Sequence, residues 1–223
     1  MAVTSNRKAT MAVMAYDFER RLTEALNRRP PRRVSVDDAR DAAVLIPIVG
    51  REKPSLIFTV RTDTLPSHKG QISFPGGSID PGDPSAESAA LREAHEEIGL
   101  GPADVRVLGE LDSVPTFVSG YVISPFVGWL DTAPDLRPNP AEVAQVLHVP
   151  VAELVDEIRR EPGFVHSDRV YPTEAWVWQG HVIWGVTARL LRMFLGLLGE
   201  AGLTPAPGET TSWTAWPLEG TAR

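Results

Sequence analysis

Residues 74–100 read FPGGSIDPGDPSAESAALREAHEEIGL, and the fold prediction starts from this stretch. A Phe-Pro-Gly-Gly turn leads through an acidic loop into a segment that ends in three closely spaced carboxylates. Asp83 followed by Pro84 predicts the start of a helix, because Asp caps free backbone amides and proline is tolerated at the first helical position. Gly99 predicts the end of this helix. We therefore expect a turn, an acidic loop and one helix.

The expected helix has two chemically different faces. At about 100° per residue, Glu96 and Glu97 lie within roughly 60° of Glu93, so the three carboxylates share one face. Like charges near a helix C-terminus repel one another and oppose the helix dipole, so we expect a cation to compensate them. The opposite face carries apolar side chains and should pack on the core: Ala90, Leu91, Ala94 and Ile98.

Arg92 is the cation that the spacing offers. It stands four residues before Glu96, the separation at which helical side chains form ion pairs. That pair leaves Glu93 and Glu97 facing outward as oxygen ligands, and oxygen-only sites suit Mg²⁺ or Mn²⁺. A solvated acidic face is the simpler interpretation, but the preceding Gly-Gly pair favours a metal site, because glycines let the backbone approach a ligand closely.

The positions that carry this pattern resemble the signature of the Nudix hydrolase family: Gly77, Asp83, Arg92, Glu93, Glu96, Glu97, Gly99 and Leu100. Asp83 stands where the family usually has Glu, and one residue more than usual separates it from Arg92. Ala94 fills a place that is usually bulky and aliphatic. The resemblance implies the α/β class, with a Nudix fold in which a mixed β-sheet is sandwiched between α-helices.

The same resemblance implies an activity and a set of site residues. A Nudix enzyme hydrolyses a diphosphate that is linked to another group, using Mg²⁺ or Mn²⁺. The catalytic residues would be Glu93, Glu96, Glu97 and Arg92, and the metal would be held by the three glutamates and Gly77.

A second resemblance lies upstream of the Phe-Pro-Gly-Gly turn. Residues 57–61 (IFTVR) and Gly70 are similar to a signature of the coenzyme A diphosphatase branch of the family, in which the longer spacing before Arg92 is also usual. This branch releases 3′,5′-ADP and 4′-phosphopantetheine. Pro66 stands where the branch commonly has an arginine that contacts phosphate. Either nearby cationic side chains make this contact, or they belong to an ordinary surface loop and the contact is missing. The resemblance implies substrate binding by Arg61, His68, Lys69 and Gly76.

Two other carboxylates are candidates for the same site. Glu142 lies in a segment similar to a family stretch near the mouth of the active site, where it could orient the attacking water. Glu110 lies in a predicted strand and would either reach the metal or have a structural role.

The other expected elements follow from periodicity and turn signals. We expect an N-terminal extension (1–38) with one amphipathic helix, a Nudix domain (39–200) and a Pro/Gly-rich tail (201–223). The helix packs on the domain, covers the substrate pocket or forms a homodimer contact. The expected helices are Tyr16–Arg28, Val151–Arg160 and Trp184–Leu198, the strands are Ala42–Val49, Ser55–Arg61, Val105–Val114 and Tyr121–Trp129, and a hairpin spans Phe164–Trp178.

The composition of the chain limits the kinds of partner and chemistry that we expect. The net charge of -7 argues against a general nucleic-acid surface, and the absence of cysteine excludes disulfides and thiolate chemistry. No apolar run approaches the roughly 18 residues of a membrane span. We therefore expect a cytoplasmic protein that acts on a small molecule, without nucleic acid or membrane as partner.

Two alternatives to coenzyme A hydrolysis stay open. A Nudix enzyme acting on ADP-ribose, NADH or another nucleoside diphosphate derivative would keep every metal residue. A Nudix-fold binding module without activity would usually lose the glutamates that this chain retains.

Overall fold

The computed structural model describes residues 17–28, 30–50, 53–62, 70–116, 119–155, 158–166 and 169–204, without the side chains of 158–166 and 169–174. The predictions for His68, Lys69 and the tail beyond residue 204 lie outside the described residues.

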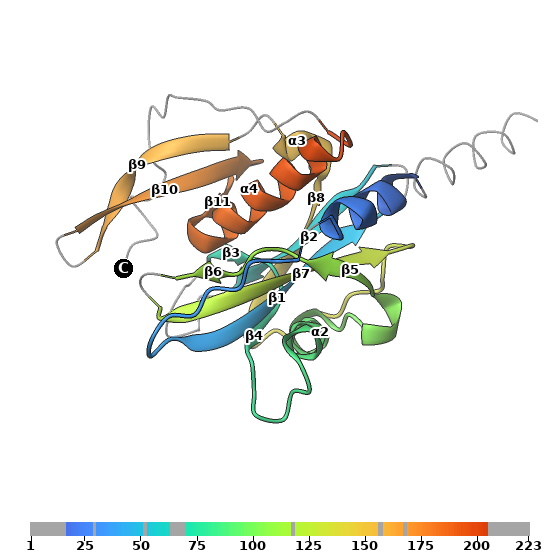
Figure 1. Cartoon of the computed structure of the whole chain (residues 1–223), viewed down its shortest axis with the longest axis horizontal. Helices are drawn as coiled ribbons and strands as arrows, with labels where there is room; N and C mark the ends of the chain where they lie inside the picture. Colours follow the sequence, from blue (N-terminus) through green and yellow to red (C-terminus); the bar gives the residue numbers. More distant parts are fainter. Residues whose placement is uncertain are drawn as a thin grey trace, which may run out of the picture.

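A mixed, eight-stranded sheet forms the centre of the fold (Figure 1). Strand β1 pairs in parallel with β7 along its whole length and antiparallel with β2 and β4. Strand β2 also pairs antiparallel with β8 and β3. The strands are β1 (Arg40–Val49), β2 (Ser55–Arg61), β3 (Ile72–Ser73), β4 (Gly76–Ser78), β5 (Arg106–Glu110), β6 (Val114–Pro115), β7 (Tyr121–Leu130) and β8 (Val143–Pro150).

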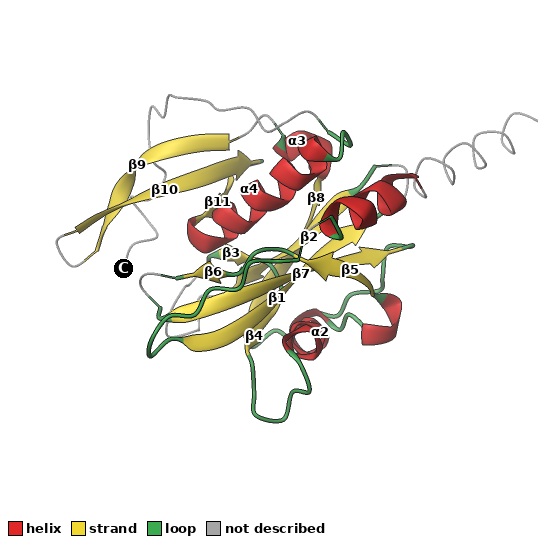
Figure 2. Cartoon of the chain, viewed as in Figure 1, coloured by secondary structure: helices red, strands yellow, loops and turns green. Residues whose placement is uncertain are grey.

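Helices cover both faces of this sheet. Helix α2 (Ala86–Ile98) lies on one face, and α4 (Gly185–Glu200) lies on the other face together with the helix that includes residues 17–26 (Figures 1 and 2). The alternation of side chains along β1 explains this arrangement, because Ala43 and Leu45 join the core around α2 whereas Ile46 and Ile48 join the core around α4. The predicted α/β sandwich is confirmed.

The N-terminal helix packs on the α4 face. Leu22 and Leu26 are buried in that core, and Phe18 stacks on Trp129 with the ring centroids 6.0 Å apart. Arg21 donates hydrogen bonds to backbone carbonyl oxygens just after α4. Packing is therefore the interpretation that the contacts support for this helix. The division of the chain into extension, domain and tail stays a prediction.

Two predicted elements are wrong in extent. Helix α3 (Val151–Leu154) is much shorter than the predicted helix 151–160. The hairpin predicted for 164–178 begins earlier than expected, because its first strand β9 (Ile158–His166) starts at residue 158. The end of α3 is held by the separate three-stranded sheet of β9, β10 and β11, because Trp176 Nε1 donates to the Leu154 carbonyl oxygen at 2.8 Å. The predicted hairpin is confirmed as β9 and β10 (Arg169–Trp178), and β11 (His181–Trp184) adds a strand that the sequence did not predict.

The predicted strand 105–114 is divided into β5 and β6. Residues 111–113 lie between the two strands. The Leu111 amide still donates to the Pro125 carbonyl oxygen of β7 at 2.9 Å, whereas Asp112 and Ser113 contact the segment that follows the N-terminal helix. The amide of Ser113 donates to the Arg32 carbonyl oxygen at 2.9 Å, and the amide of Val34 donates to Ser113 Oγ at 2.8 Å.

No helix in the described part of the chain is long and apolar enough to cross a membrane.

Candidate active site

Helix α2 positions the acidic residues, and its start differs from the expected one whereas its end does not. The N-cap is Ser85, whose Oγ accepts a hydrogen bond from the Ser88 amide at 3.1 Å. The predicted cap at Asp83 is wrong, because the Asp83 carboxylate is engaged by Arg92 and by the Asp80 amide. The predicted end is confirmed, since Gly99 has a φ of 69° in the left-handed region.

Arg92 binds three carboxylates at once. Its Nε and Nη2 lie 3.0 Å from the two oxygens of Asp83, and this pairing holds the pKa of Asp83 below its usual range. Its Nη1 lies 2.9 Å from Glu93 Oε1 and 3.0 Å from Glu96 Oε2. The predicted pair with Glu96 is therefore confirmed. The guanidinium also donates to the Ser78 carbonyl oxygen at 3.1 Å, which fixes it to β4.

Glu97 is buried, with 4% of the residue exposed, so the prediction that it faces outward is wrong. The turn at residues 74–77 explains the difference, because it places the Gly76 amide 3.4 Å from Glu97 Oε2. Burial raises the pKa of Glu97 to about 8, and the charge of Glu93 adds to this rise. The Gly76 amide and the charge of Arg61 oppose it.

Glu93 lies against Gly77. A Cβ atom at position 77 would stand 2.6 Å from the carboxyl carbon of Glu93, so only glycine permits this approach. A Cβ at Gly76 would collide with the Ala43 carbonyl oxygen of the neighbouring strand. Burial raises the pKa of Glu93, and its bond to Arg92 opposes the rise. The Gly-Gly pair therefore brings the turn into contact with the carboxylates.

The chemistry of these residues fits a hard divalent cation. In the described residues, no group of three acidic or histidine side chains is arranged to hold a metal ion as it stands, and Arg92 contacts one oxygen each of Glu93 and Glu96. The donors are nevertheless all oxygens, the type that Mg²⁺ and Mn²⁺ prefer. The charge of Glu93 makes ionisation of the buried Glu97 less favourable, a cost that a cation would relieve. Glycine at position 77 also leaves no side chain between this backbone and the Glu93 carboxylate.

Two side chains from other elements approach this cluster. Arg61, at the end of β2, lowers the pKa of Glu97, and its Nε is buried with no hydrogen-bond partner among the described residues. The charge of Glu142, from the turn before β8, raises the pKa of both Glu93 and Glu97. Glu110 has a structural contact instead, since it lies 2.6 Å from Arg33 in an ion pair and only 9% of its side chain is exposed.

The structure thus brings most of the expected site residues together. Glu93, Glu96 and Arg92 form one hydrogen-bonded group, Gly76 and Gly77 contact Glu97 and Glu93, and Arg61 lies within electrostatic range of Glu97. Their roles in catalysis, metal binding and substrate binding stay predictions. Sequence reasoning missed Asn139, which contacts both α2 and Glu142. Its position before Pro140 is a turn signal that could have drawn attention to it.

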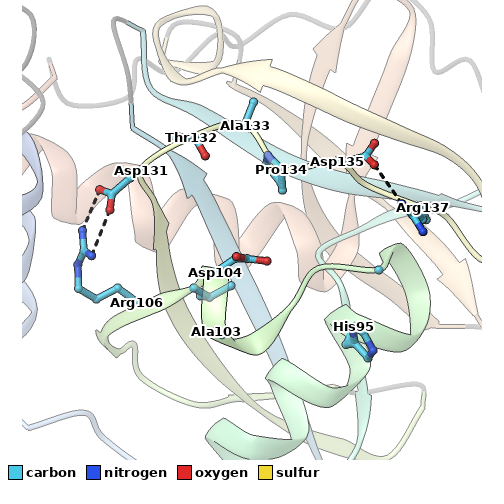
Figure 3. A pocket seen from close by; sticks show the side chains of 12 residues that line it. His95, Ala103, Asp104, Arg106, Asp131, Thr132, Ala133, Pro134, Asp135 and Arg137 are labelled. Carbon is cyan, nitrogen blue, oxygen red and sulfur yellow. Dashed lines mark hydrogen bonds and ion pairs between the residues drawn. The ribbon is translucent and has the colours of Figure 1, made fainter.

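An open hollow lies on the other side of α2, at its C-terminal end (Figure 3). His95 lines it, and because two residues correspond to a rotation of about 200°, His95 points roughly 160° away from both Glu93 and Glu97 around the helix. Its charged lining forms pairs across the rim, between Arg106 and Asp131 at 3.0 Å and between Arg137 and Asp135 at 3.4 Å. The hollow therefore lies apart from the expected site residues Glu93 and Glu97.

Comparison with known proteins agrees with this geometry. The family model described as NUDIX domain matches residues 39–173. A Photorhabdus laumondii protein named Uncharacterized Nudix hydrolase NudL is 44% identical over 170 residues, covering 73% of this chain and 86% of that protein. The protein of the same name from Escherichia coli K12 is 40% identical over 157 residues, covering 69% of this chain and 80% of its own length.

Solved structures show a more distant likeness. A Nudix hydrolase from Nitrosomonas europaea matches with a TM-score of 0.48 and 15% identity, over 80% of this chain and 81% of that one. The Nudix domain of Shewanella oneidensis NrtR, solved with ADP ribose, matches with a TM-score of 0.44 and 18% identity, over 52% of this chain and 76% of that one.

Proposed function

This chain belongs to the Nudix hydrolase family, and from that premise we propose that it hydrolyses the diphosphate of coenzyme A or an acyl-coenzyme A with the help of Mg²⁺ or Mn²⁺. The products would be 3′,5′-ADP and 4′-phosphopantetheine or its acyl derivative. The observation that carries the proposal is the buried carboxylate of Glu97, held beside Glu93 under the Gly76-Gly77 turn.

Glu93, Glu96 and Glu97 would hold the metal, with the backbone oxygen of Gly77 as a further ligand. When bound, the ion supplies positive charge to the diphosphate and acidifies water. Arg92 orients Glu93 and Glu96 through one guanidinium, as it does in the structure. A glutamate of the cluster accepts the proton of the attacking water, a contribution typically worth about 10²–10⁴ in rate.

Arg61 and Glu142 complete the proposed site from the sheet side. The buried Nε of Arg61, which has no partner among the described residues, supports a role in binding a phosphate oxygen. Glu142 is near enough to influence Glu93 and Glu97 and would help to orient the attacking water. Gly76 would contact the substrate through its backbone, and His68 and Lys69 would bind the 3′-phosphate of coenzyme A.

A panel of diphosphates tests this function. Coenzyme A, acetyl-coenzyme A, NADH and ADP-ribose are each incubated with the protein and Mg²⁺ or Mn²⁺, and the products are identified by mass. We expect coenzyme A or its ester to have the highest kcat/KM and EDTA to abolish turnover. A clear preference for ADP-ribose or NADH would show that the proposed substrate, coenzyme A or its ester, is wrong. No metal-dependent turnover of any of the four would favour a binding module.

The 3′-phosphate can be tested separately. Replacing both His68 and Lys69 by alanine should raise the KM for coenzyme A more than that for 3′-dephospho-coenzyme A, because a charge-assisted contact typically contributes about 1.5–3 kcal/mol. An equal rise for the two compounds would show that these side chains do not recognise the 3′-phosphate.

A further inference from the structure

A short turn brings Glu142 to the carboxylate cluster. Residues 140–142 form this turn immediately before β8. A glutamate on a turn samples several rotamers unless a neighbour holds it. The side chain that contacts Glu142 therefore decides how much of the time its carboxylate points to Glu93 and Glu97.

Asn139 organises this turn with both its side chain and its backbone. Its Oδ1 accepts a hydrogen bond from the Ala141 amide at 3.1 Å, as in an Asx turn. Its carbonyl oxygen accepts hydrogen bonds from the amides of Glu142 at 3.0 Å and Val143 at 2.8 Å. Its Nδ2 donates to Glu142 Oε1 at 3.4 Å. Both polar atoms of the Asn139 side chain are thus used inside the turn.

Asn139 is also attached to helix α2. Its amide donates to the Glu97 carbonyl oxygen at 2.8 Å. That carbonyl belongs to the last turn of the helix, where the oxygens have no partner within the helix. One residue therefore connects the end of α2 that carries Glu97 with the turn that carries Glu142.

Thr62 holds the same turn from the sheet side. Its amide donates to the Glu142 carbonyl oxygen at 2.9 Å, and its Oγ1 donates to the Ala141 carbonyl oxygen at 3.2 Å. These bonds hold the backbone of the turn but do not contact the Glu142 side chain, which is bound by Asn139. In the described part of the chain, the hydrogen bond that reaches the Glu142 carboxylate comes from Asn139.

The chemical type of this donor matters. Arg92 holds Glu93 and Glu96 with a full positive charge. An amide is a neutral donor, so it can orient Glu142 without cancelling its charge. Resting on the proposed function, we propose that Asn139 is a positioning residue: its side-chain amide aims the Glu142 carboxylate at the carboxylate cluster, and its backbone fixes that turn to the end of α2.

A double-mutant cycle tests this proposal. Asn139→Ser keeps a side-chain oxygen for the Ala141 amide and loses the donor to Glu142. With coenzyme A and ADP-ribose as substrates, it should lower kcat by about tenfold, within the range of supporting partners, and change KM less. In a Glu142→Gln background the same change should cost less than about twofold, because the group through which Asn139 acts is already altered.

Two further variants separate positioning from general damage to the segment. Asn139→Asp keeps the shape and the acceptor, loses the donor and adds a negative charge beside Glu142, so it should lower kcat at least as much. Arg137→Ala is the matched control, since the Arg137 amide also bonds to the end of α2 while its side chain is exposed. It should leave kcat and the thermal midpoint unchanged.

A second readout does not need turnover. Mn²⁺ affinity, measured by electron paramagnetic resonance without substrate, should fall in Asn139→Ser and should not fall further when that change is added to Glu142→Gln. Equal losses of affinity in both backgrounds, or no loss in either, would overturn the proposal. Absence of turnover by the wild type would overturn the proposed function instead, and the Mn²⁺ cycle would still decide the role of Asn139.

Discussion

The two faces of the central sheet are packed in opposite ways. The α2 face uses small helical side chains, with Ala89, Ala90 and Ala94 fully buried against the sheet. The α4 face uses large ones, including Phe194 and several leucines in the core that also holds Trp129 and Trp176. Small side chains let a helix approach a sheet closely, whereas large ones bury more apolar area. The comparison indicates that the α2 face is built to bring carboxylates to the Gly-Gly turn and the α4 face to stabilise the fold.

The largest expected effect is on the chemistry of the α2 face. Glu93→Gln and Glu97→Gln should each lower kcat by about 10²–10⁴ because they remove a proposed metal ligand or base. The fold should survive, since Glu93→Gln removes a negative charge from a repelling cluster and Glu97→Gln removes a carboxyl group whose ionisation burial already opposes. Turnover and circular dichroism of each variant check this. Turnover within a few fold of wild type in both variants would contradict the metal-site assignment.

The α4 face should respond in the opposite way. Phe194→Ala should lower the free energy of unfolding by about 3–5 kcal/mol, since it leaves a cavity in place of a fully buried ring. The kcat of the molecules that remain folded should be unchanged. Urea unfolding and activity at low temperature measure the two quantities.

The matched change on the other face is Ala94→Leu. Overpacking there should cost about 1–3 kcal/mol and also lower kcat, because it pushes Glu93 and Glu97 away from the Gly-Gly turn. If both variants changed stability and neither changed kcat, the proposed functional difference between the two faces would be contradicted.

The sequence predicted the elements that depend on local pattern. The acidic face of α2, its stop at Gly99 and the pair between Arg92 and Glu96 all follow from residue spacing, and the structure has them. The two-sided core was implied by the resemblance to the Nudix family, and the structure shows β1 contributing side chains to both sides of it. Local signals were sufficient wherever the partner lies within one helical turn or on the same strand.

The wrong predictions depend on distant segments. The burial of Glu97 requires the turn at Gly76 to fold over the helix end, which periodicity does not describe. The helix is capped by Ser85 and not by Asp83, because the Asp83 carboxylate accepts a hydrogen bond from Arg92, nine residues away. The approach of Arg61 and Glu142 depends on the pairing of β2 with β8, in which Arg61 lies opposite Val143. His68 and Lys69 lie outside the described residues, so their predicted contacts stay predictions.

A smaller effect is expected from the side chain that orders the α2 carboxylates. Arg92→Ala should weaken Mg²⁺ activation about 10–100-fold, because supporting partners of metal ligands typically contribute that much. Arg92→Lys should recover little, since an ammonium group cannot reproduce the fork that holds Asp83, Glu93 and Glu96. The Mg²⁺ concentration that gives half-maximal activity measures this. Normal activation of the alanine variant at low Mg²⁺ would show that Arg92 is only a structural charge.

The smallest effect concerns stability and pH in the metal-free protein. Burial raises the pKa of Glu97 to about 8 in the folded state, from its ordinary value of 4.5. Between these two values the unfolded chain has lost the proton and the folded protein still holds it, so raising the pH favours the unfolded chain. Wild-type stability should therefore decline from pH 4.5 to about pH 8, and the contribution of Glu97 should be constant above that.

Glu97→Gln removes this decline because glutamine does not ionise. In EDTA, its free energy of unfolding should exceed that of wild type at pH 8.5 by more than at pH 5. Even a tenfold difference in the proton affinity of Glu97 between the folded and unfolded states corresponds to about 1.4 kcal/mol. Glu96→Gln is the control, since 54% of its side chain is exposed and it is paired with Arg92. Urea unfolding at the two pH values gives the difference. An equal change in both variants would indicate general charge repulsion on α2, whereas a change confined to Glu97→Gln would locate the cost in the carboxylate beneath the Gly-Gly turn.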